Sequence, residues 1–299
     1  MNAQDRLTRF LLPTAGVRGV HVQLGAAWQE IRGRADYPPA ARRLLGEACV
    51  ASALFTGHTK IDGRLSVQLR NGGEGALRTL FAECTAAGTL RGIVQLDESG
   101  GDAPTDLRTL GEAALLAITI ENPGLDPREP QRYQSLVALD ASSLDEAFED
   151  YFRQSEQLPT RLLLAADGEH AAGLLLQKLP GDTGDQDGWN RASALFDTLA
   201  APELLGTDGQ TLLHRLFHEE QPQWLGDKPL AFACSCSRER VEAMLRALGE
   251  EEARAAAEPT GAVEIRCEFC GREYHFPLTE FGVLFAEQPA HAPASERLQ

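Results

Sequence analysis

Two close pairs of cysteines near the C-terminus constrain the fold of this chain more than any other feature. Cys234 and Cys236 form a C-x-C pair, and Cys267 and Cys270 form a C-x-x-C pair beyond residues 237–266. Two such pairs can place four sulfurs around one zinc ion and fill its tetrahedral coordination sphere. A filled sphere leaves no position for a substrate. We therefore predict one structural Zn²⁺ per monomer, bound when the thiols are reduced.

The residues around the second pair agree with a small metal-binding domain. Gly271 follows Cys270 and suits a tight turn, and strand-like runs at 263–266 and 274–276 flank the pair. His275 lies at C-x-x-C-x₄-H and is a further candidate ligand, but four thiolates already satisfy the ion. We place the zinc-binding domain at residues 234–287 and a frayed tail at 288–299.

The C-x-C pair also has redox consequences. On an extended backbone its Cα atoms lie about 6.6 Å apart, near the upper end of the disulfide range of ~4.4–6.8 Å. A bridge there would be strained, as in labile regulatory disulfides. Each pair could thus oxidise locally, which would destroy the zinc site. A plain zinc ribbon more often has a C-x-x-C pair in place of C-x-C, but the spacing alone leaves a redox-inert zinc ribbon as an equal alternative.

Composition excludes several classes of function. The 299 residues are 43% hydrophobic and 24% charged, as in a globular protein, and the formal net charge of −16 disfavours binding to nucleic acid. The apolar run at 10–12 is broken by Pro13, so we expect no signal peptide, and no run approaches the ~18 apolar residues of a membrane span. We expect a cytoplasmic protein, in which unpaired thiols stay reduced.

Residues 1–180 read as an α+β domain with antiparallel sheets. The main helix is expected at 39–55, and a capping box at 143–146 starts another. Hairpin-linked strands favour antiparallel pairing; they are expected at 17–24, 64–70, 77–84, 90–96, 115–120, 133–139, 161–166 and 171–178. The glycine cluster at 71–75 is interpreted as a hairpin turn, and Cys49 and Cys84 as core residues. His21, His58 and His170 are scattered, and no catalytic constellation appears, so we predict that the chain is not an enzyme.

Residues 181–233 differ in character. An acidic, glycine-rich tract at 181–188 marks a boundary, and the segment holds nine acidic and three basic side chains. Helical patterns occur at 189–199 and 210–217. Short helices of like charge bury too little to be stable alone, so we predict a metastable linker that is ordered only when docked; an ordinary helical connector is the alternative. Ser237 and Gly249 delimit a further helix at 238–248.

At this point the sequence resembles the bacterial 33 kDa chaperonin family, the redox-regulated holdase chaperones. The resemblance rests on C-S-C followed by C-E-F-C-G-R-E-Y-H-F (267–276), on Y-F-R-Q-S-E-Q-L-P-T (151–160), on A-G-L-L-L-Q-K-L-P (172–180) and on the hairpin region 71–92. It covers essentially the whole chain. Leu174 replaces the usual second glycine of an A-G-G run, which affects no ligand.

The resemblance implies a switch. In such proteins the four cysteines hold zinc in a reduced, inactive form. Oxidation to Cys234–Cys236 and Cys267–Cys270 disulfides releases zinc and unfolds the linker at 181–233. The protein, often as a homodimer formed through the 1–180 domain, then binds unfolding client proteins without ATP.

Two alternatives from other classes remain. A thiol-disulfide oxidoreductase would use Cys267 and Cys270, although that motif normally opens a helix after a strand. A zinc-ribbon adaptor that binds protein or nucleic acid would have activity insensitive to redox state, and the negative charge disfavours the nucleic-acid version.

Overall fold

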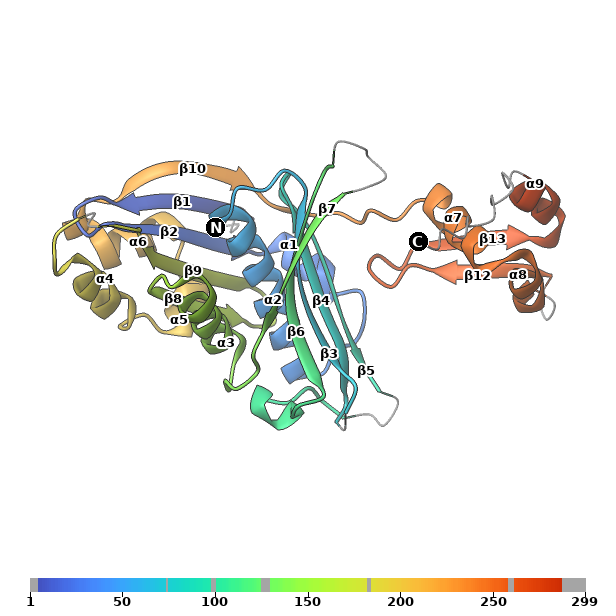
Figure 1. Cartoon of the computed structure of the whole chain (residues 1–299), viewed down its shortest axis with the longest axis horizontal. Coiled ribbons are helices and arrows are strands. Elements are labelled where there is room, and N and C mark those ends of the chain that lie inside the picture. The colour runs from blue at the N-terminus through green and yellow to red at the C-terminus, as the bar shows by residue number, and fades with distance from the viewer. Residues whose placement is uncertain are drawn as a thin grey trace, which may run out of the picture. The chain divides into compact units, whose positions relative to one another are not determined.

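The chain forms two compact units that meet between Ala233 and Cys234. The computed structural model describes residues 5–73, 75–97, 101–124, 130–181, 184–257 and 261–286 (Figure 1). The tail predicted at 288–299 lies outside these residues.

The first unit contains a five-stranded antiparallel sheet, here called sheet A, in the order β10-β1-β2-β9-β8. Its strands are β1 (Arg6–Leu12), β2 (Val17–Leu24), β8 (Thr160–Ala166), β9 (Ala171–Lys178) and β10 (Gln223–Pro229). Alternate side chains of β1 point to opposite faces of sheet A. Leu7 packs in a first core cluster, which includes side chains from residues 41–55 and from both sheets of this unit, and Phe10 and Leu12 pack in a second core cluster, which includes side chains from residues 192–217.

A six-stranded sheet, sheet B, has the order β11-β5-β4-β3-β6-β7 and is antiparallel except for the β11–β5 pair. Its strands are β3 (Arg64–Asn71), β4 (Leu77–Thr85), β5 (Thr89–Leu96), β6 (Ala114–Asn122), β7 (Gln131–Val137) and β11 (Ala231–Phe232). The predicted hairpin-linked strands are therefore present, and the α+β class with antiparallel sheets is confirmed.

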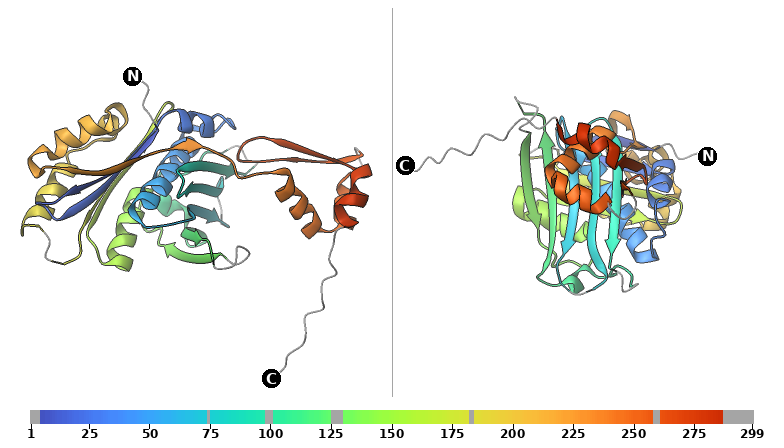
Figure 2. Two further views of the ribbon diagram at one scale, coloured as in Figure 1. Left: turned by 90° about the horizontal axis from the view of Figure 1, so that it is seen from above. Right: turned by 90° about the vertical axis from the view of Figure 1, so that its right-hand side faces the viewer.

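Helix α2 (Pro39–His58) packs between the two sheets (Figure 1; Figure 2). Pro39 stands in the first helical turn, where a missing N–H costs nothing, and residues 44–56 are all buried. The approach to sheet B is close: a Cβ added at Gly92 would lie 2.8 Å from Cys49 Sγ. Cys49 and Cys84 are fully buried in the first core cluster, as predicted.

Three shorter elements complete this layer: α1 (Ala26–Arg32), the 3₁₀ turn η1 (Leu107–Leu110) and α3 (Leu144–Tyr151), which continues into a π-helical turn, η2 (Phe152–Glu156). Helix α3 begins after Ser143, as predicted, but the capping differs. The Glu146 carboxylate accepts hydrogen bonds from the Ser142 N–H at 3.0 Å and hydroxyl at 2.7 Å, not from Ser143.

The segment from 184 to 233 is here called the connector. Its helical part packs on the face of sheet A that is opposite to α2. Its helices are α4 (Gly188–Phe196), α5 (Ala201–Gly206), α6 (Gly209–Phe217) and the 3₁₀ turn η3 (His218–Glu220). They form the second core cluster with β1, β2 and β9, and the rings of Phe10 and Phe217 stack with centroids 6.1 Å apart. The neighbour on which these helices dock is thus sheet A. Strands β10 and β11, which the sequence did not predict, complete the connector.

The second unit has its own small core. It comprises α7 (Arg238–Leu248), α8 (Glu250–Ala257), the antiparallel pair β12 (Ala262–Arg266) and β13 (Glu273–Pro277), the 3₁₀ turn η4 (Leu278–Glu280) and α9 (Phe281–Ala286). The Ser237 hydroxyl caps α7 by accepting from Arg240 N–H, and Gly249 ends the helix at φ 104°, both as predicted. Helix α8 begins with three acidic residues in its first turn, where negative charge is favourable.

No helix among the described residues is both long and apolar enough to cross a membrane.

Candidate metal centre

The four cysteines of the two pairs come together within the second unit. Cys234 and Cys236 lie on the extended segment before α7, and Cys267 and Cys270 lie in the turn that joins β12 to β13. In that turn Cys267 N–H donates to Arg272 O at 2.9 Å and Gly271 N–H donates to Cys267 O at 2.7 Å. Gly271 has φ 70°, a conformation that glycine adopts without strain. The turn holds both sulfurs on one side of the hairpin end.

The sulfur positions fit a tetrahedral metal. All four Sγ atoms lie within 4.8 Å of one another, and the Sγ atoms are 3.6 Å apart for Cys234 and Cys267 and 3.3 Å apart for Cys236 and Cys270. Zinc–sulfur bonds of about 2.3 Å in a tetrahedron place neighbouring sulfurs about 3.8 Å apart. All four residues are free thiols of intermediate burial. Four thiolate donors with this spacing therefore suit a soft, tetrahedral ion such as Zn²⁺.

The four thiols differ electrostatically. Burial, together with hydrogen bonds to the other thiols, raises the pKa of Cys234 to about 12. Burial also opposes ionisation of Cys236, but hydrogen bonds from Tyr274 and the neighbouring thiols outweigh it and lower the pKa of Cys236 to about 7. Burial raises the pKa of Cys270. Cys236 therefore ionises more readily than Cys234 and Cys270.

Arg238 and Arg240 fix the segment that carries Cys234 and Cys236. The Arg238 guanidinium stacks over the Phe276 ring at 4.3 Å and donates to His275 O at 3.2 Å, which ties the start of α7 to β13. Arg240 Nη1 donates to Ser235 O at 2.9 Å, between the two cysteines. These contacts orient the ligand segment from outside the sulfur cluster, as supporting residues do in metal sites.

Tyr274 and His275, neighbours on β13, differ in their relation to the cluster. The buried Tyr274 hydroxyl lies beside the Cys236 sulfur, and the hydrogen bond that it donates is stronger when Cys236 is a thiolate. His275 is exposed and its Nδ1 lies 3.5 Å from Glu264 Oε1, so it faces its cross-strand neighbour. Among the described residues it is not part of the group that could hold a metal.

The remaining thiols are unsuited to chemistry. Burial raises the pKa of Cys84 to about 12 and that of Cys49 further still. Neither belongs to the metal group. The C-x-x-C pair, for its part, is followed by Gly271 and β13 and does not open a helix, so it lacks the helix N-terminus that activates the thiol of disulfide oxidoreductases.

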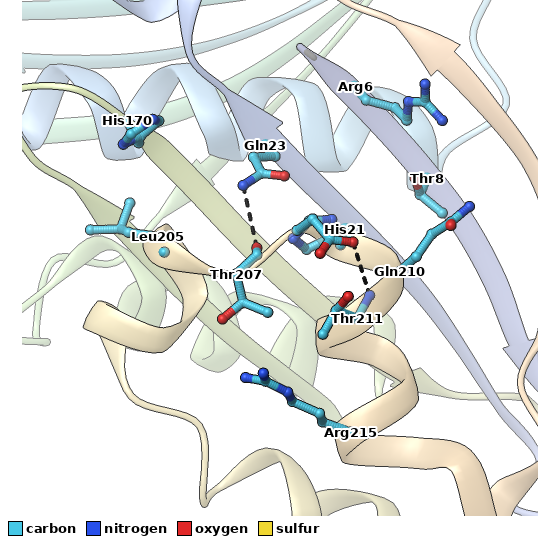
Figure 3. Close-up of a pocket in the computed structure, with 13 residues that line it drawn as sticks. Arg6, Thr8, His21, Gln23, His170, Leu205, Thr207, Gln210, Thr211 and Arg215 are labelled. Carbon is cyan, nitrogen blue, oxygen red and sulfur yellow. Dashed lines mark hydrogen bonds between the residues drawn. The ribbon is translucent and has the colours of Figure 1, made fainter. Parts of the chain in front are cut away.

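A second feature, which the sequence did not indicate, is a pocket of about 610 Å³ between sheet A and the α5–α6 turn (Figure 3). Gln23 Nε2 donates to Thr207 O at 3.3 Å on its rim, and Asp208 caps α6 by accepting from Thr211 N–H. His21 lines the pocket and is only 2% exposed. Its burial, opposed by the Asp208 carboxylate, lowers its pKa to about 4.

Comparison with known proteins agrees with this architecture. Residues 5–277 match the sequence model of the family described as Hsp33 protein. The chain is 43% identical to the 33 kDa chaperonin of Ectopseudomonas mendocina, covering 98% of this chain and 99% of the relative. It is 40% identical to that of Nitrosococcus oceani, covering 96% of each, and 41% identical to that of Chromobacterium violaceum, covering 95% of each.

A solved structure shares the fold. The crystal structure of the 33 kDa chaperonin of Thermotoga maritima superposes with a TM-score of 0.75 and 21% identity, covering 95% of this chain and 98% of that one. The match of the family model, the full-length relatives and the four-thiol cluster together show that the chain belongs to the Hsp33 family of chaperones, proteins that bind unfolded clients.

Proposed function

We propose that this chaperone is a redox-regulated holdase whose switch is the four-thiol cluster. The observation that carries the proposal is the convergence of Cys234, Cys236, Cys267 and Cys270 within 4.8 Å, as free thiols, in a unit that begins directly after the connector. The Zn²⁺ that suits these donors would link both pairs and contribute folding free energy on the order of 10 kcal/mol. In this state the second unit is folded and the chaperone is inactive.

Oxidation would break the cluster. Each pair, Cys234–Cys236 and Cys267–Cys270, forms one disulfide with the loss of two electrons and two protons, and hydrogen peroxide that accepts them is reduced to two water molecules. A disulfide no longer supplies thiolate ligands, so the metal is released. The segment that carries Cys234 and Cys236 would then be held only by the contacts of Arg238 and Arg240 and no longer by the metal. The hydrophobic core of the second unit is small, so the stability of this unit depends strongly on the metal that links its two cysteine pairs.

The connector is the element that responds. Its last strand, β11, ends at Phe232, so only Ala233 separates it from Cys234. The connector helices are short and amphipathic, and their buried residues Leu212, Leu213 and Phe217 all face sheet A. Undocking would expose these side chains and the surface beneath them. Their acidic surroundings would keep complexes with clients soluble.

The proposal includes further properties that the likeness to the family supports. Residues 1–180 form the client-binding and dimerisation domain, residues 181–233 the redox-sensitive linker and residues 234–287 the zinc-binding switch. The oxidised protein acts as a homodimer in the cytoplasm, binds clients without ATP and catalyses no reaction. It needs neither nucleic acid nor a membrane as a partner.

Aggregation of an unfolding enzyme tests the proposal. Citrate synthase diluted from guanidinium scatters light as it aggregates, and oxidised protein at near-stoichiometric amounts should suppress this scattering without ATP. Reduced, zinc-loaded protein should not, and reductant should reverse the effect. Equal suppression by both forms would reject the switch, and metal content and free thiols measured on the same samples would show whether the cluster had changed state.

A further inference from the structure

We propose that the edge of β1, which β10 covers in the docked connector, is the client-binding site of the active chaperone and takes an extended client segment as an added antiparallel strand. The inference rests on the proposed function, because β1 has a free edge only when the connector undocks. It adds to that function a binding surface and a mode of recognition.

Strand β10, which covers the edge of β1, is weakly attached to it. Strand β10 pairs with β1 from Arg6↔Pro229 to Leu11↔Gln223, but the register shifts between Arg9 and Phe10. It contains Gly226 at φ 143° and ends at Pro229, residues that are unfavourable in strands. Its side chains are exposed at every position except the partly buried Lys228. Main-chain pairing therefore dominates its attachment to β1, and it contributes little apolar burial.

A few side-chain contacts hold β10 in place. Asp227 accepts from Arg6 Nη1 at 2.8 Å and from the Thr8 hydroxyl at 2.7 Å, and Leu230 N–H donates to Asp5 O at 3.0 Å just beyond the strand. The Arg6–Asp227 pair is about 40% exposed at both side chains, so solvent screens it and it stabilises the strand only weakly. Lys228 Nζ also donates to Ala86 O at 2.6 Å. Because the remaining side chains of β10 are exposed, another extended segment can replace its main-chain pairing with β1.

Strand β1, in contrast to β10, has deeply buried apolar side chains. Leu7, Phe10 and Leu12 of β1 are almost completely buried. On one side Leu7 stays in the core under α2, which keeps β1 in the sheet when the connector leaves. On the other side Phe10 and Leu12 lie under the connector helices. Undocking would therefore leave a rigid strand edge beside an apolar floor, to which Val17, Leu174 and Leu176 also contribute.

Such an edge suits an unfolded polypeptide. Unpaired N–H and C=O groups along an edge strand bind any extended chain through its main chain, which gives affinity without a required sequence. The apolar floor adds a preference for segments with apolar residues at alternate positions. The pairing with β10 itself demonstrates that an antiparallel strand fits there.

Hydrogen exchange of the full-length protein tests the site. Strand β1 pairs with β10 on one edge and with β2 on the other, so only its alternate amides face β10. These amides of residues 6–12 should be protected in the reduced protein and should exchange in the oxidised protein. They should regain protection, at least tenfold, in the complex with citrate synthase that has been unfolded in guanidinium. The amides of β8, which lies at the far edge of sheet A, serve as the control and should change little on client binding.

A peptide spanning residues 222–230 provides a second, sharper test. Labelled peptide should bind oxidised but not reduced protein and should compete with the client. One version carries N-methyl groups on residues whose N–H groups face β1 in the docked pairing, and the other on residues whose N–H groups point away, assigned separately on each side of the register shift. Because alternate N–H groups of a strand point to the same side, one version should lose binding at least tenfold and the other should keep it.

Two outcomes would overturn the inference. Oxidised protein that suppresses aggregation while its β1 amides exchange equally fast with and without client would exclude the site and leave the proposed function intact. Equal binding of the two N-methylated peptides would exclude strand pairing. If oxidised protein fails to suppress aggregation at all, the proposed function and the inference both fail.

Discussion

Replacement of His21 by leucine should stabilise the docked connector, and increasingly so in acid. The His21 ring lies against the start of α6, where a Cβ added at Gly209 would lie 2.6 Å from its Nδ1. Its Nε2 is buried without a hydrogen-bond partner. Leaving such a polar atom unsatisfied costs about 1–3 kcal/mol. His21→Leu removes this cost, so the variant should be more stable by a similar amount at pH 7.

The pH dependence follows from the lowered pKa. When the connector undocks, His21 regains its ordinary pKa near 6.5, whereas in the docked state burial keeps its pKa at about 4. Below pH 6.5 the undocked state binds a proton that the docked state does not, so docking weakens as pH falls and levels off below pH 4. The loss attributable to His21 is about 2 kcal/mol at pH 5 and about 3 kcal/mol at the limit.

Other charged groups face the same pocket. Asp208 on α6 favours protonation of His21, whereas Arg6 on β1 and Arg215 on α6 also line the pocket and oppose it; Thr8 and Gln23 are neutral. Thiols of the metal site also take up protons in acid. The quantity to measure is therefore the difference between the variant and the wild type at each pH, because terms common to both proteins cancel.

Limited proteolysis of the connector in reduced protein, with urea titrations at pH 7, 6 and 5, measures this difference. His170→Leu is the matched control, because His170 lines the same pocket but is only partly buried. The stability gap between His21→Leu and the wild type should widen by about 2 kcal/mol between pH 7 and pH 5. A constant gap, or an equal widening for His170→Leu, would refute the reasoning.

Three further predictions concern the switch and its cover. Reduced protein should contain one zinc per monomer by elemental analysis, and Cys236→Ser should lower this content at least tenfold; zinc-free wild type would contradict the site. Arg191→Met should lower the urea midpoint of the connector, because Arg191 pairs with Asp185 at 2.9 Å and with the buried Glu220 at 2.8 Å, and its loss leaves the Glu220 carboxylate without this partner. Arg215→Met, which loses one exposed 3.6 Å pair, should lower the midpoint clearly less. Phe217→Ala, which empties a fully buried site, should cost about 3–5 kcal/mol and make reduced protein sensitive to protease within the connector; unchanged cleavage would show that this packing does not hold it.

Local chemistry made much of the fold predictable. Helix α7 begins and ends where Ser237 and Gly249 place it, and α2 follows its proline start, because capping and periodicity depend on neighbours in the sequence. The cysteine cluster was equally predictable, because a C-x-C pair and a C-x-x-C pair each place two sulfurs close enough to bind the same ion.

Elements that depend on distant partners were not predictable. Residues 223–229 read Q-W-L-G-D-K-P, with no alternation and with glycine and proline, and they form β10 only because the edge of β1 supplies hydrogen-bond partners. Arg238 supports the ligand segment through Phe276 and His275, which the fold alone brings near. His21 looked like an isolated histidine because its burial comes from Gly209 on α6, far along the chain.

The reactivity of the two core cysteines measures whether the core of the first unit is still folded. Cys49 and Cys84 are fully buried, and the Cys49 sulfur is packed against Gly92, whereas the other four cysteines are partly exposed. An alkylating reagent should therefore label the six thiols in two kinetic classes. The fast class counts the thiols of the four-cysteine cluster that remain reduced, and the slow class reacts only when α2 separates from sheet B. One labelling time course, read by mass spectrometry, would distinguish a chaperone that has been activated from one that has itself begun to denature.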